Sequence, residues 1–229
     1  MEYPHNRPYT ADDLVHIITL LRDPVNGCPW DKVQTHTSIR MNFLEEAYEA
    51  VDALDLDDPV LMCEELGDVL MQVAFHTCME QETGRFTWEQ VCDGVCQKLI
   101  ERHPNIFGTQ PGYEGITDWD ALKNKEKGRR TLADELESVP RAMPALMRAA
   151  KLQKRAARHG AALQGADAAA LADAAENLQT AQPASAQAEQ AVGELLFAAA
   201  NLARQAGVEP EQALQKANEA FCTAAGPVA

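Results

Sequence analysis

The sequence predicts an all-α protein made of two helical modules. Its length, 229 residues, suits two domains of about 100 residues each. In the first half, apolar residues recur at helical spacing between short segments rich in proline, glycine and asparagine. In the second half alanine, the strongest helix former, dominates residues 161–191. These observations indicate two helical bundles in tandem.

The first half predicts a series of helices joined by short breaks. Thr10 is a candidate cap for a helix over 10–21. Residues 22–32 hold two prolines and an Asn-Gly pair, which predict a loop. Further helices are expected over 38–56, 60–82, 87–101 and 118–126. Because Asp57 to Pro59 form a short turn, we expect helices 38–56 and 60–82 to pack antiparallel.

The domain boundary is expected where helical periodicity is weakest. Pro140 and Pro144 interrupt this region, so residues 1–128 form the first module, 129–144 a linker and 145–229 the second module. Residues 64–75, EELGDVLMQVAF, align with residues 190–201, QAVGELLFAAAN, with Gly67 opposite Gly193. This similarity predicts a diverged tandem repeat, whose alanine-rich second copy has smaller side chains for its core.

Charge and composition exclude several kinds of partner. The formal net charge is −15, from 35 acidic against 20 basic residues, so the surface repels the phosphate backbone of nucleic acids. No apolar run reaches membrane-spanning length, and the polar start does not resemble a signal peptide. The six cysteines have no zinc-ligand spacing. We expect a cytoplasmic protein that binds neither nucleic acid nor a membrane.

Acidic residues gather on two neighbouring predicted helices. The predicted apolar stripe of helix 38–56 consists of Leu44, Ala47, Tyr48 and Val51. Beside it, within about 100° of arc, lie Glu45, Glu46 and Glu49. In helix 60–82, Glu65 and Asp68 flank Gly67, which costs about 1 kcal/mol in a helix interior and therefore indicates a close approach of a helix or ligand.

These five carboxylates would repel one another across an antiparallel pair unless cations neutralised them. Oxygen donors without histidine favour Mg²⁺ or Mn²⁺ over Zn²⁺, and the implied chemistry is metal-assisted attack of water on a phosphoanhydride. Two alternatives stay open: a solvated acidic face on surface helices, and a noncatalytic module that binds a partner protein. A di-iron carboxylate bundle is disfavoured because the cluster lacks Glu-x-x-His pairs.

The motif Glu45-Glu46-x-x-Glu49, followed by Glu65-Leu-Gly-Asp68, resembles the EExxE and ExxD signature of the MazG nucleotide pyrophosphohydrolases. Residues 21–36 and 98–107 resemble the same family's N-terminal domain, and the similarity continues more weakly towards the C-terminus. The resemblance implies tandem MazG-like helical bundles, a dimer, and Mg²⁺-dependent hydrolysis of a nucleoside triphosphate to the monophosphate and pyrophosphate. A housekeeping role towards noncanonical nucleotides, or a dedicated enzyme for one nucleotide, fits the same motif.

The resemblance also implies roles for particular residues. By this resemblance, the metal ligands are Glu46, Glu49, Glu65 and Asp68. Glu45 is then the candidate for orienting or deprotonating the attacking water. Lys98 and Arg102, one helical turn apart, are candidates for binding the triphosphate, although their spacing equally fits a solvated helix face. Trp30 is a candidate for stacking on the base or for packing, and His36 or Asn42 for contacting sugar or phosphate.

The second half is expected to lack catalytic activity. With Gly67 aligned to Gly193, Glu65 falls on Ala191 and Asp68 on Glu194. The segment that should read Glu-Glu-x-x-Glu is residues 173–177, DAAEN, so of the three motif positions only the first, Asp173, is acidic. The family's C-terminal Lys-Asn-Lys motif keeps Lys216 and Asn218 but ends in Ala220. We therefore expect a retained fold without chemistry, with dimer support as its role.

Overall fold

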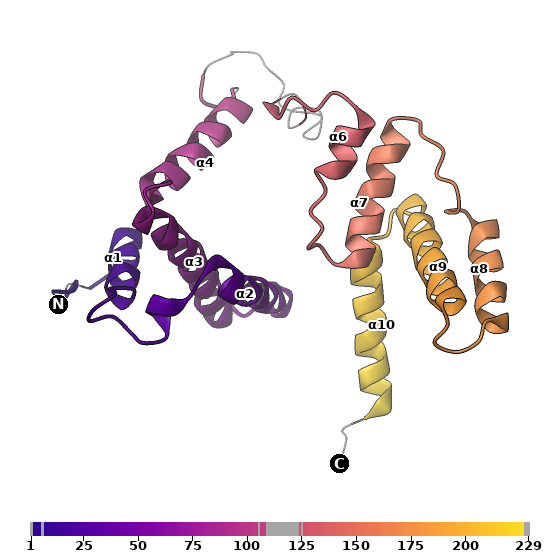
Figure 1. Ribbon diagram of the computed structural model, residues 1–229, viewed down its shortest axis with the longest axis horizontal. Helices are drawn as coiled ribbons and strands as arrows, with labels where there is room; N and C mark the ends of the chain where they lie inside the picture. Colours follow the sequence, from indigo (N-terminus) through magenta and orange to yellow (C-terminus); the bar gives the residue numbers. More distant parts are fainter. Residues whose placement is uncertain (1, 6, 105, 109–123, 125, 227–229) are drawn as a thin grey trace. The chain divides into compact units, whose positions relative to one another are not determined.

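The computed structural model describes residues 2–5, 7–104, 106–108, 124 and 126–226 (Figure 1). These residues form helices and loops and contain no β-strand, which confirms the predicted all-α fold class. The chain divides into two compact units, Met1–Ile116 and Thr117–Ala229.

The helices of the first unit begin where local sequence signals place them. They are α1 (Ala11–Leu21), the 3-10 helix η1 (Asp31–Val33), α2 (His36–Leu56), α3 (Pro59–Glu82) and α4 (Trp88–Arg102). The hydroxyl oxygens of Thr10, Thr35 and Thr87 accept hydrogen bonds from backbone N–H groups in the first turns of α1, α2 and α4. Four expected helices are thus confirmed, whereas most of the fifth, 118–126, lies outside the described residues.

Helices α2 and α3 form an antiparallel hairpin. Asp57 ends α2 in the left-handed conformation, with φ 54°, and the side chain of Asp58 caps α3. Contacts pair the start of α2 with the end of α3, because His36 lies against Glu80. They pair the middle of α2 with the middle of α3, because Glu46 accepts a hydrogen bond from Gln72. The predicted antiparallel packing is therefore confirmed.

The core of the first unit lies around the C-terminal half of α3. Its buried members are Ile18, Ile39, Ala74, Phe75, Cys78, Met79 and Trp88. Arg22 closes one side of this core, since its buried guanidinium donates to the Glu82 carboxylate and to the backbone carbonyl of Asp31. This buried charge is therefore paired, and it fixes the loop before α2 against α3.

The expected apolar stripe of α2 is wrong, and the expected close approach of another helix to Gly67 is not found. Tyr48 and Val51, members of the predicted apolar stripe, are 54% and 49% exposed, and α2 instead buries Ile39, Ala50 and Ala53. Periodicity shows that a helix has an apolar side but not which neighbour covers it. Gly67 marks no close approach within the described chain, because a Cβ added there would meet no atom within 4 Å.

The second unit includes residues that the sequence assigned to a linker. It contains α6 (Leu132–Glu137), α7 (Ala145–Arg158), α8 (Ala168–Thr180), α9 (Ala186–Gln205) and α10 (Pro210–Ala225). Within the expected linker, 129–144, α6 packs against α7 and Val139 is buried. The buried guanidinium of Arg155 donates to the Glu135 carbonyl and the Ser138 hydroxyl. The segment is thus part of the second unit, held by polar contacts that periodicity cannot reveal.

Helices α8 and α9 pack side by side and correspond to the repeat seen in the sequence. Residues 64–75 lie on α3 and residues 190–201 on α9, so each copy forms part of the second helix of a packed pair. Ala174 on α8 and Ala191 and Ala198 on α9 are buried, which allows the two helices to approach closely. In the described part of the chain, no helix is both long enough and apolar enough to cross a membrane.

Candidate active site

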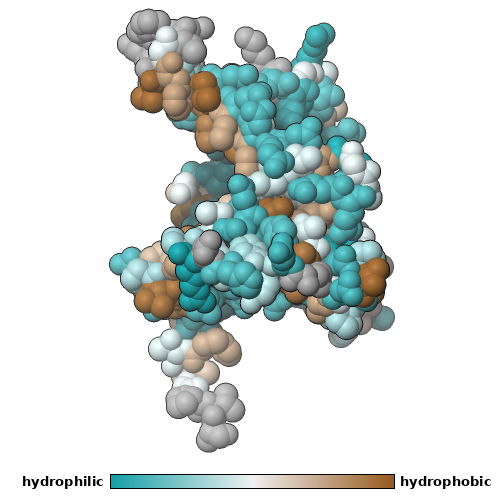
Figure 2. Space-filling model, turned by 90° about the vertical axis from the view of Figure 1, so that its left-hand side faces the viewer, coloured by the Kyte–Doolittle hydropathy of each residue, from teal (hydrophilic) through white to brown (hydrophobic). Residues whose placement is uncertain are grey.

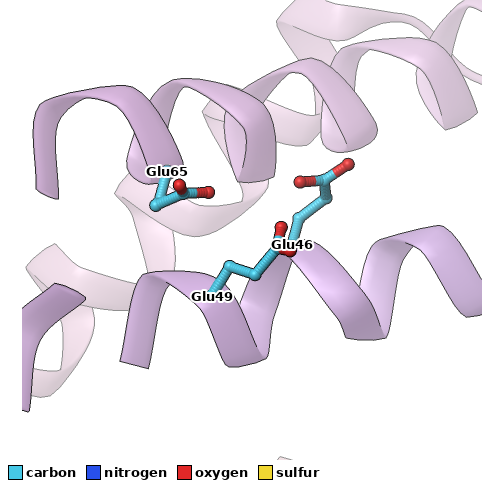
Figure 3. Close-up of side chains that lie close together, drawn as sticks. All are labelled: Glu46, Glu49 and Glu65. Atoms are coloured by element: carbon cyan, nitrogen blue, oxygen red, sulfur yellow. The ribbon is translucent and has the colours of Figure 1, made fainter. Parts of the chain in front are cut away.

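Three carboxylates converge between α2 and α3. Glu46 and Glu49 extend from α2 and Glu65 from α3, and each contributes an oxygen atom lying within 4.8 Å of the others (Figure 3). We call these residues the acidic triad. Glu46 and Glu65 are half-buried and Glu49 is exposed. The antiparallel hairpin thus brings together two motifs that are separate in the sequence.

Ionisation of the acidic triad is unfavourable, because the pKa values of Glu46 and Glu65 are both raised. Burial raises the pKa of Glu46, the hydrogen bond from Gln72 opposes this shift, and the charges of Asp68 and Glu49 raise the pKa further. Burial also raises the pKa of Glu65, assisted by the charges of Glu64, Asp68 and Glu46. Asp68 therefore borders the triad electrostatically, although its oxygens are not among the three that converge.

The donor set fits a hard divalent cation. Carboxylate oxygens alone make up the triad, and among the described residues it is the one group of three or more His, Cys, Asp or Glu side chains close enough to share a metal ion. Such ligands suit Mg²⁺ or Mn²⁺, whereas Zn²⁺ prefers nitrogen and sulfur. A bound cation would offset the burial and the mutual repulsion that together raise the two pKa values.

Gln72 holds Glu46 in place, a role that sequence reasoning missed. The Gln72 amide Nε2 donates to Glu46 Oε1 at 3.3 Å, and the side chain is only 7% exposed. Its Oε1 is buried and has no hydrogen-bond partner among the described residues. The available signal was the position of Gln72 one helical turn after Asp68, on the side of α3 that faces α2.

Other candidate residues occupy varied positions. Glu45 is exposed on α2, Asn42 is half-buried, and Trp30 is 57% exposed just before η1. Lys98 is exposed on α4, and Arg102 is the last residue of that helix. Within the described residues, the structure brings the side chains of Trp30, Asn42 and Lys98 into no hydrogen bond or ion pair with the acidic triad. Their roles remain predictions.

His36 belongs to a hydrogen-bonded chain that was not predicted. Its Nδ1 lies 2.8 Å from Nδ1 of His76, and its Nε2 lies 2.5 Å from Oε1 of Glu80. Arg85 contacts both Glu80 oxygens, with its Nε 2.6 Å from Oε2 and its Nη2 2.6 Å from Oε1. His76 and Glu80 continue the i, i+4 spacing of Asp68 and Gln72 along α3, which is the sequence signal for this chain.

Fold and site together define a class of protein: an all-α protein with an oxygen-only carboxylate cluster, a candidate cation site, between two antiparallel helices. Residues 34–107 match the model of the MazG nucleotide pyrophosphohydrolase domain. Over 219 residues, 92% of this chain and 83% of the relative, the sequence is 41% identical to the nucleoside triphosphate pyrophosphohydrolase of Escherichia coli strain K12. The chain therefore belongs to the MazG family of nucleotide pyrophosphohydrolases, which confirms the resemblance.

Further relatives support this assignment. Over 212 residues, 92% of this chain and 82% of the relative, the sequence is 37% identical to the Thermotoga maritima nucleoside triphosphate pyrophosphohydrolase/pyrophosphatase MazG. A Mycobacterium tuberculosis nucleoside triphosphate pyrophosphohydrolase is 34% identical over 154 residues, 66% of this chain and 46% of that protein. Hydrolases of this family are generally dependent on divalent metal ions, and the acidic triad is a carboxylate cluster of the kind that can hold such an ion.

Proposed function

We propose that the first unit hydrolyses nucleoside triphosphates to the monophosphate and pyrophosphate, with Mg²⁺ as the natural cation and Mn²⁺ able to replace it. The acidic triad is the observation that carries this proposal. It supports Glu46, Glu49 and Glu65 as ligands, with Asp68 beside them completing the set. Family membership and the identities of the relatives support the substrate class and the reaction.

The bound cation would neutralise phosphate charge and make a phosphorus atom easier to attack. The side chains of this chain orient the reactants. Gln72 restrains the Glu46 carboxylate, and we assign Glu45, exposed beside the triad on α2, to orienting or deprotonating the attacking water. Lys98 and Arg102 are assigned to the triphosphate, Trp30 to stacking on the base, and His36 or Asn42 to the sugar or phosphate.

Turnover by the full chain tests this function directly. With Mg²⁺, we expect at least one nucleoside triphosphate to yield equal amounts of monophosphate and pyrophosphate, and EDTA to abolish the reaction because the carboxylates then lack their counter-charge. The panel should include canonical, deoxy and noncanonical nucleotides and phosphoribosyl-ATP, analysed by ion-exchange chromatography. Activity on a single member would identify a dedicated enzyme. Absence of metal-dependent turnover across the panel, or release of orthophosphate alone, would contradict the proposal.

We also propose a homodimer, because the hairpin leaves large apolar side chains uncovered. Exposed apolar residues on the first unit include Tyr48, Val51, Leu54, Leu66, Leu70, Val95 and Leu99. Figure 2 shows hydrophobic patches interrupting a largely hydrophilic surface. Exposed apolar area of this kind marks association surfaces, and most soluble oligomers are symmetric.

Sedimentation equilibrium should therefore give twice the chain mass of 25.1 kDa. Replacing Val51 and Leu54 with lysine should shift the protein towards the monomer, because buried charges without partners oppose association. Lysine at Val25, which is 78% exposed in the loop before η1, provides a matched control that should leave the dimer intact. A monomer at all concentrations would contradict the proposed assembly.

The negative charge of the chain argues against nucleic acid as a partner. All six cysteines are free thiols, which is typical of a reducing compartment. We therefore place the enzyme in the cytoplasm, acting on free nucleotides.

A further inference from the structure

A pocket of about 430 Å³ lies beside the acidic triad on the same hairpin, within the size range of ligand sites. Its lining includes His36 and Phe43 on α2, His76 and Glu80 on α3, and Phe86 before α4. The His36 side chain is 43% exposed, so the pocket opens to solvent. Aromatic walls with few polar groups suit a planar heteroaromatic ring.

One wall of this pocket is polar and holds the side chains of His76, His36 and Glu80, which together with Arg85 form a hydrogen-bonded chain that we call the relay. Glu80, 7% exposed, is held by Arg85 at both carboxylate oxygens and by Nε2 of His36 at Oε1. The rings of His36 and His76 join through their Nδ1 atoms at 2.8 Å, with planes within 7° of parallel. Phe43 packs against His76 with the ring centroids 5.9 Å apart. The two imidazoles therefore have restricted orientations.

This geometry determines which hydrogen-bonding group the relay offers. Carboxylates only accept, so Nε2 of His36 carries the proton donated to Glu80. In neutral rings, Nδ1 of His36 then accepts from the N–H at Nδ1 of His76, which leaves Nε2 of His76 as an acceptor. Burial, together with the nearby His36, lowers the pKa of His76 and so favours its neutral form. Nε2 of His76 has no hydrogen-bond partner among the described residues.

The pocket and the acidic triad are connected by a row of polar side chains on one side of α3. Asp68, Gln72 and His76 follow one another at four-residue spacing on α3, so about 12 Å of helical rise separates the first from the last. Gln72 lies between the two sites, and its buried Oε1 has no hydrogen-bond partner in the described part of the chain. In a nucleotide whose phosphates lie at the acidic triad, the ribose would therefore lie beside Gln72 and the base would extend towards the relay.

We propose that this pocket receives the nucleobase and that Nε2 of His76 accepts a hydrogen bond from its exocyclic amino group. This inference rests on the proposed function and adds the base-reading residue to it. A base with a carbonyl oxygen in place of the amino group would set two acceptors against each other. Such a mismatch lowers kcat/KM because a buried polar atom is left unpaired.

Matched substrates test the proposal on the full chain. ATP and ITP differ at C6, amino against carbonyl, and at the adjacent ring nitrogen, which accepts in ATP and donates its N–H in ITP. CTP and UTP differ in the same way. For at least one of these pairs we expect kcat/KM to favour the amino base by about tenfold, as a lost hydrogen bond typically does. In His76→Phe the ratio of kcat/KM between the amino and carbonyl bases should approach one. The change should come mainly from a higher KM for the amino base, whose kcat should stay within about threefold of the wild-type value. His16→Phe, an exposed histidine on α1, is the matched control and should keep the wild-type ratio.

A measurement without phosphates separates this inference from the proposed function. In protein with ¹⁵N-labelled histidine, adenosine or cytidine should shift the His76 imidazole resonances more than inosine or uridine does, even if no triphosphate is hydrolysed. His76→Gln, which keeps a polar side chain, provides a second variant should the phenylalanine disturb folding, and it should reduce the preference only partly. Equal use of amino and carbonyl bases by the wild type, or collapse of the preference in Trp30→Leu but not in His76→Phe, would overturn the proposal.

Discussion

Replacing Glu46 with glutamine is expected to lower kcat/KM by more than about 100-fold, the largest effect predicted for a single side chain. Glu46 is half-buried between α2 and α3, accepts the hydrogen bond from Gln72, and shares the acidic triad with Glu49 and Glu65. Glutamine preserves the size of the side chain but removes the charge that a cation needs. Steady-state kinetics with a Mg²⁺ titration, and isothermal titration calorimetry of Mn²⁺ binding, should both show the loss.

The same substitution should stabilise the protein when no cation is present. The pKa values of Glu46 and Glu65 are raised, so the folded protein holds more protons than the unfolded chain just above the ordinary glutamate pKa. Stability of the apo protein therefore falls as pH rises through this window and stays lower at neutral pH. Thermal melts in EDTA should show this fall in the wild type and a smaller one in Glu46→Gln.

The matched control is Asp55→Asn, which removes one exposed carboxylate from the same helix outside the triad. It should keep wild-type turnover and the wild-type dependence of stability on pH. Full activity in Glu46→Gln, or equal losses in both variants, would remove the basis for assigning the triad to catalysis.

The second unit should contribute no turnover, because the positions of two metal ligands hold buried alanines. Ala174 and Ala191, which align with Glu46 and Glu65, are each 2% exposed, and their side chains help α8 and α9 to pack. Asp173 and Glu194 still line a pocket of about 470 Å³, but two carboxylates provide too few ligands for the cation chemistry proposed above. Within the described residues, no group of three metal-ligating side chains lies in this unit.

We therefore expect the full chain carrying Asp173→Asn and Glu194→Gln to keep its kcat/KM within about twofold, whereas Glu46→Gln alone should lose more than about 100-fold. As a second comparison, a fragment of residues 1–128 should hydrolyse nucleotides if it stays soluble. A fragment of the second unit should not, and it should begin at residue 129 because α6 packs on α7. Metal-dependent turnover by the second fragment would refute this assignment.

Local chemistry explains why the sequence predicted the helices so well. Caps and helix-breaking residues act within a few positions along the chain, so Thr10, Thr87 and Pro59 mark helix starts without reference to the rest of the fold. The spacing of Glu46 and Glu49 placed both on one side of α2, and the short turn at Asp57 required an antiparallel partner. The converging carboxylates of the first unit were therefore predictable, as was their erosion in the second.

Only the tertiary structure decided which helix faces meet. The Glu46 side of α2 faces α3 and the side with Tyr48 and Val51 does not, because burial depends on neighbours distant in sequence. The same contacts bring His36 to His76 and Glu80, forming a relay that single-chain periodicity cannot show. By itself, the sequence determined the helices and the chemical type of the site. Packing determined which carboxylates converge and which polar groups line the adjoining pocket, since both require the two helices to be in register.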